Sequence, residues 1–254
     1  MDRLFDQVIG LADFIKRQWR LVAELVYPPV IGLFKALWKG LDIQFEFEGQ
    51  DNLPRKGGAV IACNHVSYLD FAFIGTGALH LKRYIRFMAK KGAFDNKIAG
   101  PLLRGMKHIS VDRENGGASF VTALRALRDG EIVGIFPEAT ISQSFEIKAM
   151  KSGAVRLAMG AGVPVIPVVI WGSQRVWTKG QPRNFSRKSI PVHIVYGTPM
   201  HFAKDGNLEE AEALLRKTMI QMLHKLQEKY PDSHVGEPWA PQRLGGTAPA
   251  PVIE

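Results

Sequence analysis

Short apolar strands alternate with helical segments from residue 41 to residue 230, and this alternation restricts the fold more than any other feature of the 254-residue chain. The expected strands lie within residues 41–49, 57–65, 84–90, 107–113, 131–140, 163–172 and 188–199, and the expected helices begin near Ser67 or lie within 94–106, 116–130, 151–162 and 207–230. Such alternation is typical of parallel strands joined by helical crossovers. The sequence therefore predicts an α/β fold with a mostly parallel central sheet flanked by helices.

Residues 1–40 are expected to form an N-terminal pair of amphipathic helices. Apolar residues recur every three or four positions across 4–26, and Pro28 and Pro29 separate this helix from a second one over 30–39. Because Lys and Arg flank apolar and aromatic side chains in both helices, we expect the pair to dock on a membrane surface. The alternative is that the pair packs on the domain core or on another subunit.

The last 24 residues differ in composition from the rest of the chain. Five prolines and three glycines interrupt any regular helix or strand across 231–254, so this segment is expected to be flexible or to drape over the surface. The predicted organisation is therefore a helix pair at 1–40, an α/β domain at 41–230 and a Pro/Gly-rich tail at 231–254.

Charge restricts the class of partner. The chain carries a formal net charge of +9, and residues 147–204 hold nine Lys or Arg and no Asp or Glu. Such a basic surface suits an anionic membrane, a phosphorylated metabolite or a nucleic acid. No zinc-finger pattern, RNP-like stretch or basic–aromatic repeat accompanies it, so no nucleic-acid partner is expected. The single cysteine, Cys63, excludes an intrachain disulfide and fits a cytosolic compartment.

Chemically versatile residues follow three of the expected strands. These stretches are Asn64-His65, Asp112-Arg113 and Phe136-Pro137-Glu138. In open α/β sheets, ligands bind outside the carboxyl ends of the strands. The three stretches are therefore candidates for a single site, provided that their strands are neighbours in the sheet.

His65 and Asp70 are five positions apart, a spacing that would point them about 140° away from each other on one helix. If the strand ends at Asn64 and the helix begins near Ser67, a bend lies between them and the carboxylate can reach the imidazole. The pair would then be a general base and the residue that orients it. The alternative is a capping box of Ser67 and Asp70 beside a structural histidine, and the two roles would compete for the carboxylate.

Four blocks within about residues 58–172 resemble, in order, the motifs of the glycerolipid acyltransferase family, lysophosphatidic acid acyltransferase type. The blocks are Asn64-His65 with Asp70, the stretch ending at Arg113, Phe136-Pro137-Glu138, and Val163, Pro164, Ile166 and Pro167. The resemblance implies that His65 is the general base for an acceptor hydroxyl and that Asp70 orients it. It also implies acyl-CoA as a co-substrate, direct transfer without a covalent enzyme intermediate, and no cofactor or metal.

The same resemblance implies a set of substrate-binding residues around this catalytic pair. The set is Asn64, Lys90, Lys91, Arg113, Phe136, Pro137, Glu138, Thr140, Lys151 and Arg175. Arg113 is expected to hold the acceptor phosphate, with Lys90 and Lys91 adding positive charge. The alternative for Arg113 is an ion pair with Asp112 or Glu138. Glu138 itself is expected at the acceptor site.

The third block departs from the family pattern at two positions. Ala139 stands where relatives have Gly, which predicts a turn without a positive φ at this position. Ile141 stands where relatives have an Arg that is a candidate phosphate ligand. Either the acceptor differs or another cation supplies that charge. The candidate cations are Arg175, Lys151, Arg156 and Lys179.

These features predict an acyl-CoA-dependent O-acyltransferase that makes phosphatidic acid from a lysophosphatidic acid-like acceptor in phospholipid synthesis. The alternative acceptors are glycerol 3-phosphate or another hydroxyl compound such as a glycolipid. Alternatives from other classes are a metal-dependent hydrolase that uses His65 and Asp70, and a non-catalytic membrane scaffold.

The expected location is the cytoplasmic face of the cell membrane, with peripheral or monotopic attachment. The longest apolar stretch, 21–38, contains Glu24, Lys35 and two prolines, which make it a poor membrane span. Residues 1–20 lack the uninterrupted apolar core of a signal peptide.

Overall fold

A seven-stranded sheet forms the centre of the computed structural model, which describes residues 24–112 and 116–251. The strands are β1 (Gln44–Glu48), β2 (Ala59–Cys63), β3 (Ile85–Lys90), β4 (Ile109–Val111), β5 (Ile132–Ile135), β6 (Val165–Trp171) and β7 (Pro191–Tyr196). Their order is β1-β7-β6-β2-β5-β3-β4, and every neighbouring pair is parallel except β6 and β7. The predicted α/β class with a mostly parallel sheet is confirmed.

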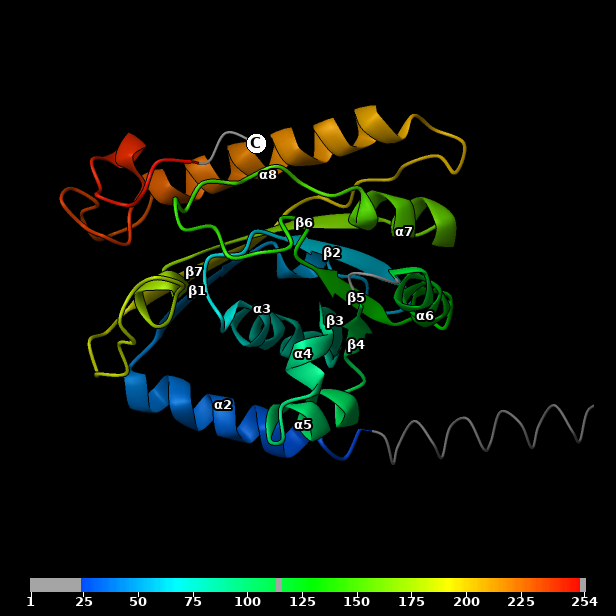
Figure 1. Ribbon diagram of the computed structural model, residues 1–254, viewed down its shortest axis with the longest axis horizontal. Coiled ribbons are helices and arrows are strands. Elements are labelled where there is room, and N and C mark those ends of the chain that lie inside the picture. The colour runs from blue at the N-terminus through cyan, green and yellow to red at the C-terminus, as the bar shows by residue number, and fades with distance from the viewer. Residues whose placement is uncertain (1–23, 113–115, 252–254) are drawn as a thin grey trace, which may run out of the picture.

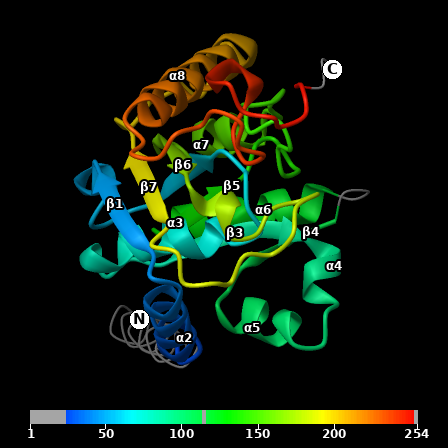
Figure 2. The same ribbon diagram turned by 90° about the vertical axis from the view of Figure 1, so that its left-hand side faces the viewer.

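Helices cover both faces of the sheet (Figure 1). They are α2 (Tyr27–Leu41), α3 (Asp70–Ala78), α4 (Lys91–Phe94), α5 (Ala99–Gly105), α6 (Gly116–Arg128), α7 (Gly153–Ala161) and α8 (Leu208–Glu228). Helices α7 and α8 lie on one face, whereas α3 lies between the other face and α2. Figure 2 shows α2 and α5 together on the side of the molecule opposite α8. Both faces of the sheet are thus covered by helices.

Strand burial follows position in the sheet. All five residues of β2 are buried because this strand lies between β6 and β5 and is covered on both faces. In contrast, β1 lies at the edge, where Phe45 and Phe47 are half-buried and the alternate residues Gln44, Glu46 and Glu48 are exposed. This is the apolar–polar alternation of a half-buried strand that the sequence predicts.

The N-terminal helix α2 packs against the domain. Pro28 and Pro29 occupy its first turn, where a missing N–H costs no helical hydrogen bond, so the second predicted helix begins at Tyr27 rather than near residue 30. Tyr27 stacks on Tyr84 at 4.2 Å, and Trp38 stacks on Phe73 at 4.0 Å. The predicted helix at 4–26 lies outside the described residues except for its last three.

The Pro/Gly-rich tail packs on the domain over its described part, residues 231–251. Trp239 and Ala240 are buried, and the Trp239 ring lies 6.4 Å from the ring of Trp171 at the end of β6. Of the two forms expected for the tail, the structure has the draped one. The preceding helix α8 is capped as predicted, because the Asn207 side chain accepts the first N–H groups of the helix.

Candidate active site

The carboxyl ends of β2, β5 and β6 meet at one edge of the sheet. These three strands are parallel neighbours, with β2 in the middle, so the residues that follow them come together. His65 follows β2, Phe136 follows β5 and Ser173 follows β6. The condition that the sequence left open is therefore met for the first and third stretches, whose strands β2 and β5 are neighbours. It is not met for Asp112-Arg113, because β4 lies at the edge of the described sheet and pairs there only with β3.

His65 and Asp70 form a hydrogen-bonded pair across the bend between β2 and α3. Nδ1 of His65 lies 2.9 Å from Oδ2 of Asp70. Helix α3 begins at Asp70, three residues later than predicted, so His65 lies outside the helix and the carboxylate at its first position. The Asp70 side chain is fully buried, whereas one fifth of the His65 side chain is exposed. A substrate can therefore reach the imidazole but not the carboxylate.

The Asp70 carboxylate also caps the turn that precedes its own helix. Its Oδ2 accepts the backbone N–H groups of Val66 and Ser67, each at 2.8 Å, and its Oδ1 accepts the hydroxyl of Ser173 at 2.6 Å. An oxygen that accepts two N–H bonds is an acceptor toward His65 as well, so Nδ1 carries the ring proton and Nε2 is the free base. The prediction that capping and the His65 contact would compete is wrong, because one oxygen makes both contacts.

Contacts hold both the imidazole ring and the backbone of His65 in place. The Phe136 ring stacks on it with 4.1 Å between centroids, and Phe87 stacks in turn on Phe136 at 5.6 Å. The His65 backbone N–H donates to Oε1 of Glu138 at 2.9 Å, and its carbonyl accepts the N–H of Ser142 at 2.8 Å. Such support holds a base in one orientation before a substrate arrives.

Glu138 is buried and uses both carboxylate oxygens on backbone groups. Its second oxygen, Oε2, accepts the N–H of Lys148 at 3.1 Å. Burial raises the pKa of Glu138 to about 7, although these two N–H donors favour the ionised form. Glu138 therefore links the His65 turn to the loop at Lys148 through both of its carboxylate oxygens.

The turn after Glu138 brings a lysine that the sequence prediction missed. The ammonium group of Lys148 donates to the hydroxyl of Thr140, which is exposed. Ala139 has φ of +58°, so the prediction of a turn without positive φ is wrong. The backbone keeps the left-handed conformation that glycine adopts more easily. The spacing of Lys148, ten residues after Glu138 in the basic stretch, was the available signal.

Other predicted residues of this loop contact the site through the backbone. The carbonyl of Pro137 accepts the N–H of Lys151 at 2.9 Å, and the Lys151 side chain is exposed. Ile141, which replaces the usual Arg, is buried. Lys148, which is half-buried, and Lys151, which is exposed, are the lysines of this loop.

Two predicted substrate-binding residues, Asn64 and Arg175, make their side-chain contacts with other parts of the fold. Asn64 is buried, and its side-chain amide pairs with both the N–H and the carbonyl of Ile170, which joins β2 to β6. The guanidinium of Arg175 donates to Tyr230 at 2.8 Å and to Asp232. These are contacts within the fold, and the buried Asn64 side chain faces β6 rather than a substrate. The guanidinium of Arg175 is partly exposed, so substrate binding by Arg175 stays a prediction.

The other cations predicted to bind substrate are two lysines at the end of β3 and Arg113. Lys90 and Lys91 are exposed, and the ammonium group of Lys91 lies 3.1 Å from the carboxylate of Asp112. Arg113 lies outside the described residues. Of the other candidates, the Arg156 guanidinium lies over the Phe120 ring at 5.4 Å, and Lys179 is exposed.

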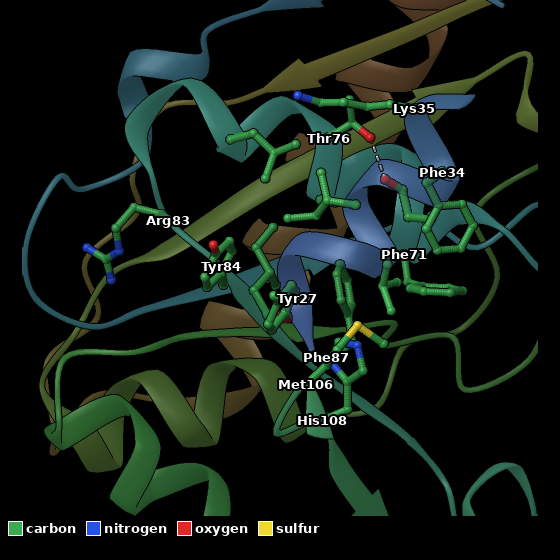
Figure 3. Close-up of a pocket in the computed structure, with 16 residues that line it drawn as sticks. Tyr27, Phe34, Lys35, Phe71, Thr76, Arg83, Tyr84, Phe87, Met106 and His108 are labelled. Carbon is green, nitrogen blue, oxygen red and sulfur yellow. Dashed lines mark hydrogen bonds between the residues drawn. The ribbon is translucent and has the colours of Figure 1, made fainter. Parts of the chain in front are cut away.

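An apolar cavity of about 50 Å³ lies between α2, α3 and β3. Figure 3 shows Phe34, Phe71 and Phe87 around it, together with Tyr27 and Met106. Because Phe87 also stacks on Phe136, two rings separate this cavity from His65. Its lining is mainly aromatic and aliphatic, so it suits apolar rather than charged groups.

Two further features bear on cofactors and membranes. Among residues 24–112 and 116–251, no three His, Cys, Asp or Glu side chains are grouped so as to hold a metal ion. In the same described ranges, no helix combines the length and the apolar character that a membrane span requires.

Comparisons with known proteins agree with this geometry. The family model described as Acyltransferase matches residues 44–171. The chain is 34% identical over 186 residues to the 1-acyl-sn-glycerol-3-phosphate acyltransferase of Bacillus subtilis, which covers 71% of this chain and 86% of the relative. It is 27% identical over 195 residues to the enzyme of the same name from Borreliella burgdorferi, with 75% and 76% covered.

A solved structure shares the fold. The crystal structure of the 1-acyl-sn-glycerophosphate (LPA) acyltransferase PlsC from Thermotoga maritima matches with a TM-score of 0.63 at 20% identity, covering 91% of this chain and all of that one. The matched family region contains the paired His65 and Asp70 and the stacked Phe136. On this evidence the chain belongs to the acyltransferase family.

Proposed function

We propose that this protein transfers a fatty acyl group from acyl-CoA to the free hydroxyl of a lysophosphatidic acid-like acceptor, which yields phosphatidic acid. The observation that carries the proposal is the 2.9 Å contact between Nδ1 of His65 and the buried Asp70 carboxylate. This contact leaves Nε2 as a base at the accessible edge of the sheet. The relatives named for the same acceptor support the choice of substrate.

The reaction proceeds by direct displacement at the thioester. The acceptor hydroxyl gives its proton to Nε2 of His65 while its oxygen bonds to the carbonyl carbon. The resulting tetrahedral intermediate then collapses, the carbon–sulfur bond breaks, and the CoA sulfur takes the proton from the imidazolium. Asp70 stabilises the positive charge that the ring carries between these two steps. Each atom and proton is thereby accounted for without a covalent enzyme intermediate.

Lysines of the loop after β5 are suited to the acceptor phosphate. Lys148 lies on the loop that Glu138 joins to the His65 turn, and its ammonium group reaches Thr140. Lys148 thus supplies positive charge beside the turn where Ile141 replaces the usual Arg, and Lys151 lies three residues further on. We assign the acceptor phosphate to this loop, and Arg113 to the same role on the sequence pattern alone.

Membrane attachment is part of the proposal because the lysophospholipid acceptor and the phosphatidic acid product are membrane lipids. Leu25 and Leu33 are 68% and 65% exposed on the α2 side, and Ile98, just before α5, is 79% exposed. Figure 2 shows that α2 and α5 share one side of the molecule. Exposed apolar side chains beside Lys35 and Lys97 suit the interface of an anionic bilayer. The cytoplasmic face remains the proposed location.

An acceptor panel tests the proposed reaction. Purified protein in detergent is given labelled palmitoyl-CoA together with lysophosphatidic acid, glycerol 3-phosphate or monoacylglycerol, which is an acceptor without phosphate. We expect labelled phosphatidic acid to form fastest. A parallel assay with palmitoyl-acyl carrier protein in place of palmitoyl-CoA tests the identity of the acyl donor. Faster acylation of glycerol 3-phosphate or of the unphosphorylated acceptor would refute the assigned substrate.

A further inference from the structure

We propose that Ser173 is a positioning residue for the catalytic pair and that the C-terminal tail holds it in place. The inference rests on the proposed function, because it assigns Asp70 the task of orienting the base. Ser173 lies outside the region that matches the family model, residues 44–171. The tail is further away in sequence, yet it packs on the same strand end.

Ser173 completes the set of donors around the Asp70 carboxylate. Its hydroxyl is fully buried and donates to Oδ1 at 2.6 Å, whereas the contacts with Val66, Ser67 and His65 all use Oδ2. The hydroxyl of Ser173 thus holds the carboxylate from the side opposite His65. A donor on each oxygen fixes the rotation of the carboxylate plane and therefore the direction in which Oδ2 meets the imidazole.

The position immediately before Ser173 accepts only glycine. Gly172 has φ of +99°, and a Cβ atom there would lie 2.0 Å from the carbonyl oxygen of Pro191. The Gly172 N–H donates to the side chain of Gln174 at 2.8 Å. This turn therefore sets the position of Ser173 at the end of β6 by close approach to β7.

The tail braces the short helix η3 (Ser173–Arg175) that carries this hydroxyl. The Gln174 side chain donates to the carbonyl of Trp239 at 3.3 Å. The Arg175 guanidinium lies 4.5 Å from the centre of the Trp239 ring and also donates to Tyr230 and Asp232. Every residue of η3 therefore has a fixed contact, two of them with the chain after α8, and the first residue contacts the catalytic carboxylate.

A double-mutant cycle tests this role in the full-length protein. Ser173→Ala is made in the wild-type chain and in Asp70→Ala, and Ser119→Ala is the control, because it removes a buried hydroxyl bonded to Gly116 on α6. We expect Ser173→Ala to lower kcat about 10-fold with little change in KM, and to lower it no further in Asp70→Ala. Ser119→Ala should keep the wild-type kcat.

A spectroscopic readout separates this inference from the proposed reaction. The Nδ1–H proton resonance of His65 in NMR spectra should shift or broaden in Ser173→Ala and stay unchanged in Ser119→Ala. If the wild-type protein acylates none of the acceptors, the proposed function fails, yet this resonance still decides the role of Ser173. An unchanged resonance, or the same loss of kcat in both backgrounds, would show that Ser173 does not act through Asp70.

Discussion

The carboxylate of Glu138 holds the backbone of His65: its Oε1 accepts the His65 N–H at 2.9 Å, while Oε2 accepts the N–H of Lys148 at 3.1 Å. The turn that carries the base and the loop that carries the proposed phosphate-binding lysine are thus joined through one buried side chain. This link gives a residue of the third motif block a structural task that requires no contact with substrate.

Glu138 makes stability depend on pH in a defined direction. Burial raises its pKa from 4.5 to about 7, so between these values the folded protein holds a proton that the unfolded chain has released. Its contribution to the free energy of unfolding is therefore complete below about pH 4.5 and falls by about 3 kcal/mol as the pH rises to about 7. Glu138→Gln should remove this component, measured as the difference between urea midpoints of the two proteins from pH 5 to about 8. Parallel profiles for the two proteins would contradict the assignment.

Lys148→Ala should weaken the binding of the acceptor rather than that of the acyl donor. Removing an exposed ammonium group from the proposed phosphate site should raise the KM of lysophosphatidic acid roughly 10-fold and leave the KM of palmitoyl-CoA unchanged. The backbone bond to Glu138 does not need the side chain, so the turn at His65 should persist. The control is Lys188→Ala, which removes an exposed lysine from the loop before β7. An unchanged acceptor KM would move the phosphate site away from this loop.

Asn64→Ala should destabilise the fold without weakening substrate binding. The substitution leaves the N–H and the carbonyl of Ile170 without their partner inside the sheet, which should cost about 2–4 kcal/mol in the free energy of unfolding. The KM of each substrate should stay close to wild type in the folded variant. Asn207→Ala, which removes the cap of α8, is the reference for a loss of about 1 kcal/mol. A stable Asn64→Ala protein with a raised acceptor KM would return Asn64 to the substrate site.

Arg175→Ala separates the two roles considered for this arginine. Because its guanidinium contacts Asp232, Tyr230 and Trp239, its loss should loosen η3 and lower kcat roughly 3- to 10-fold, with no change in the acceptor KM. Arg187→Ala, which removes a surface ion pair with Asp42, should have no effect on kcat. If Arg175 instead holds the acceptor phosphate, its removal will raise that KM.

Much of the fold and the central pair of the site follow from local patterns. The apolar runs of β2 and β6 and the Asn207 cap are properties of neighbouring residues, and the spacing of His65 and Asp70 requires only a bend between them. Such short-range patterns are what sequence periodicity and capping rules describe.

The missed features depend on contacts between distant segments. Ser173 meets Asp70 only because β6 is the neighbour of β2, a pairing of residues 103 positions apart. Asn64 looked like a site residue because it precedes His65, but its side chain faces the next strand. The φ of Ala139 reflects a turn held by Glu138 and the surrounding loop, which overrides the local cost of a left-handed alanine. Ser173 follows the expected strand at 163–172, so its place at a strand end was the available signal in the sequence.

The role of His65 as general base is tested by the rate at which His65→Ala transfers palmitate from palmitoyl-CoA to lysophosphatidic acid. The rate is compared with that of the wild type at saturating substrates. Since His65 is partly exposed and its contact is with a carboxylate that keeps three other donors, the variant should stay folded, with a thermal unfolding midpoint close to wild type. We expect a kcat at least about 10²-fold lower, the scale of a lost general base. Wild-type turnover by the folded variant would contradict this role.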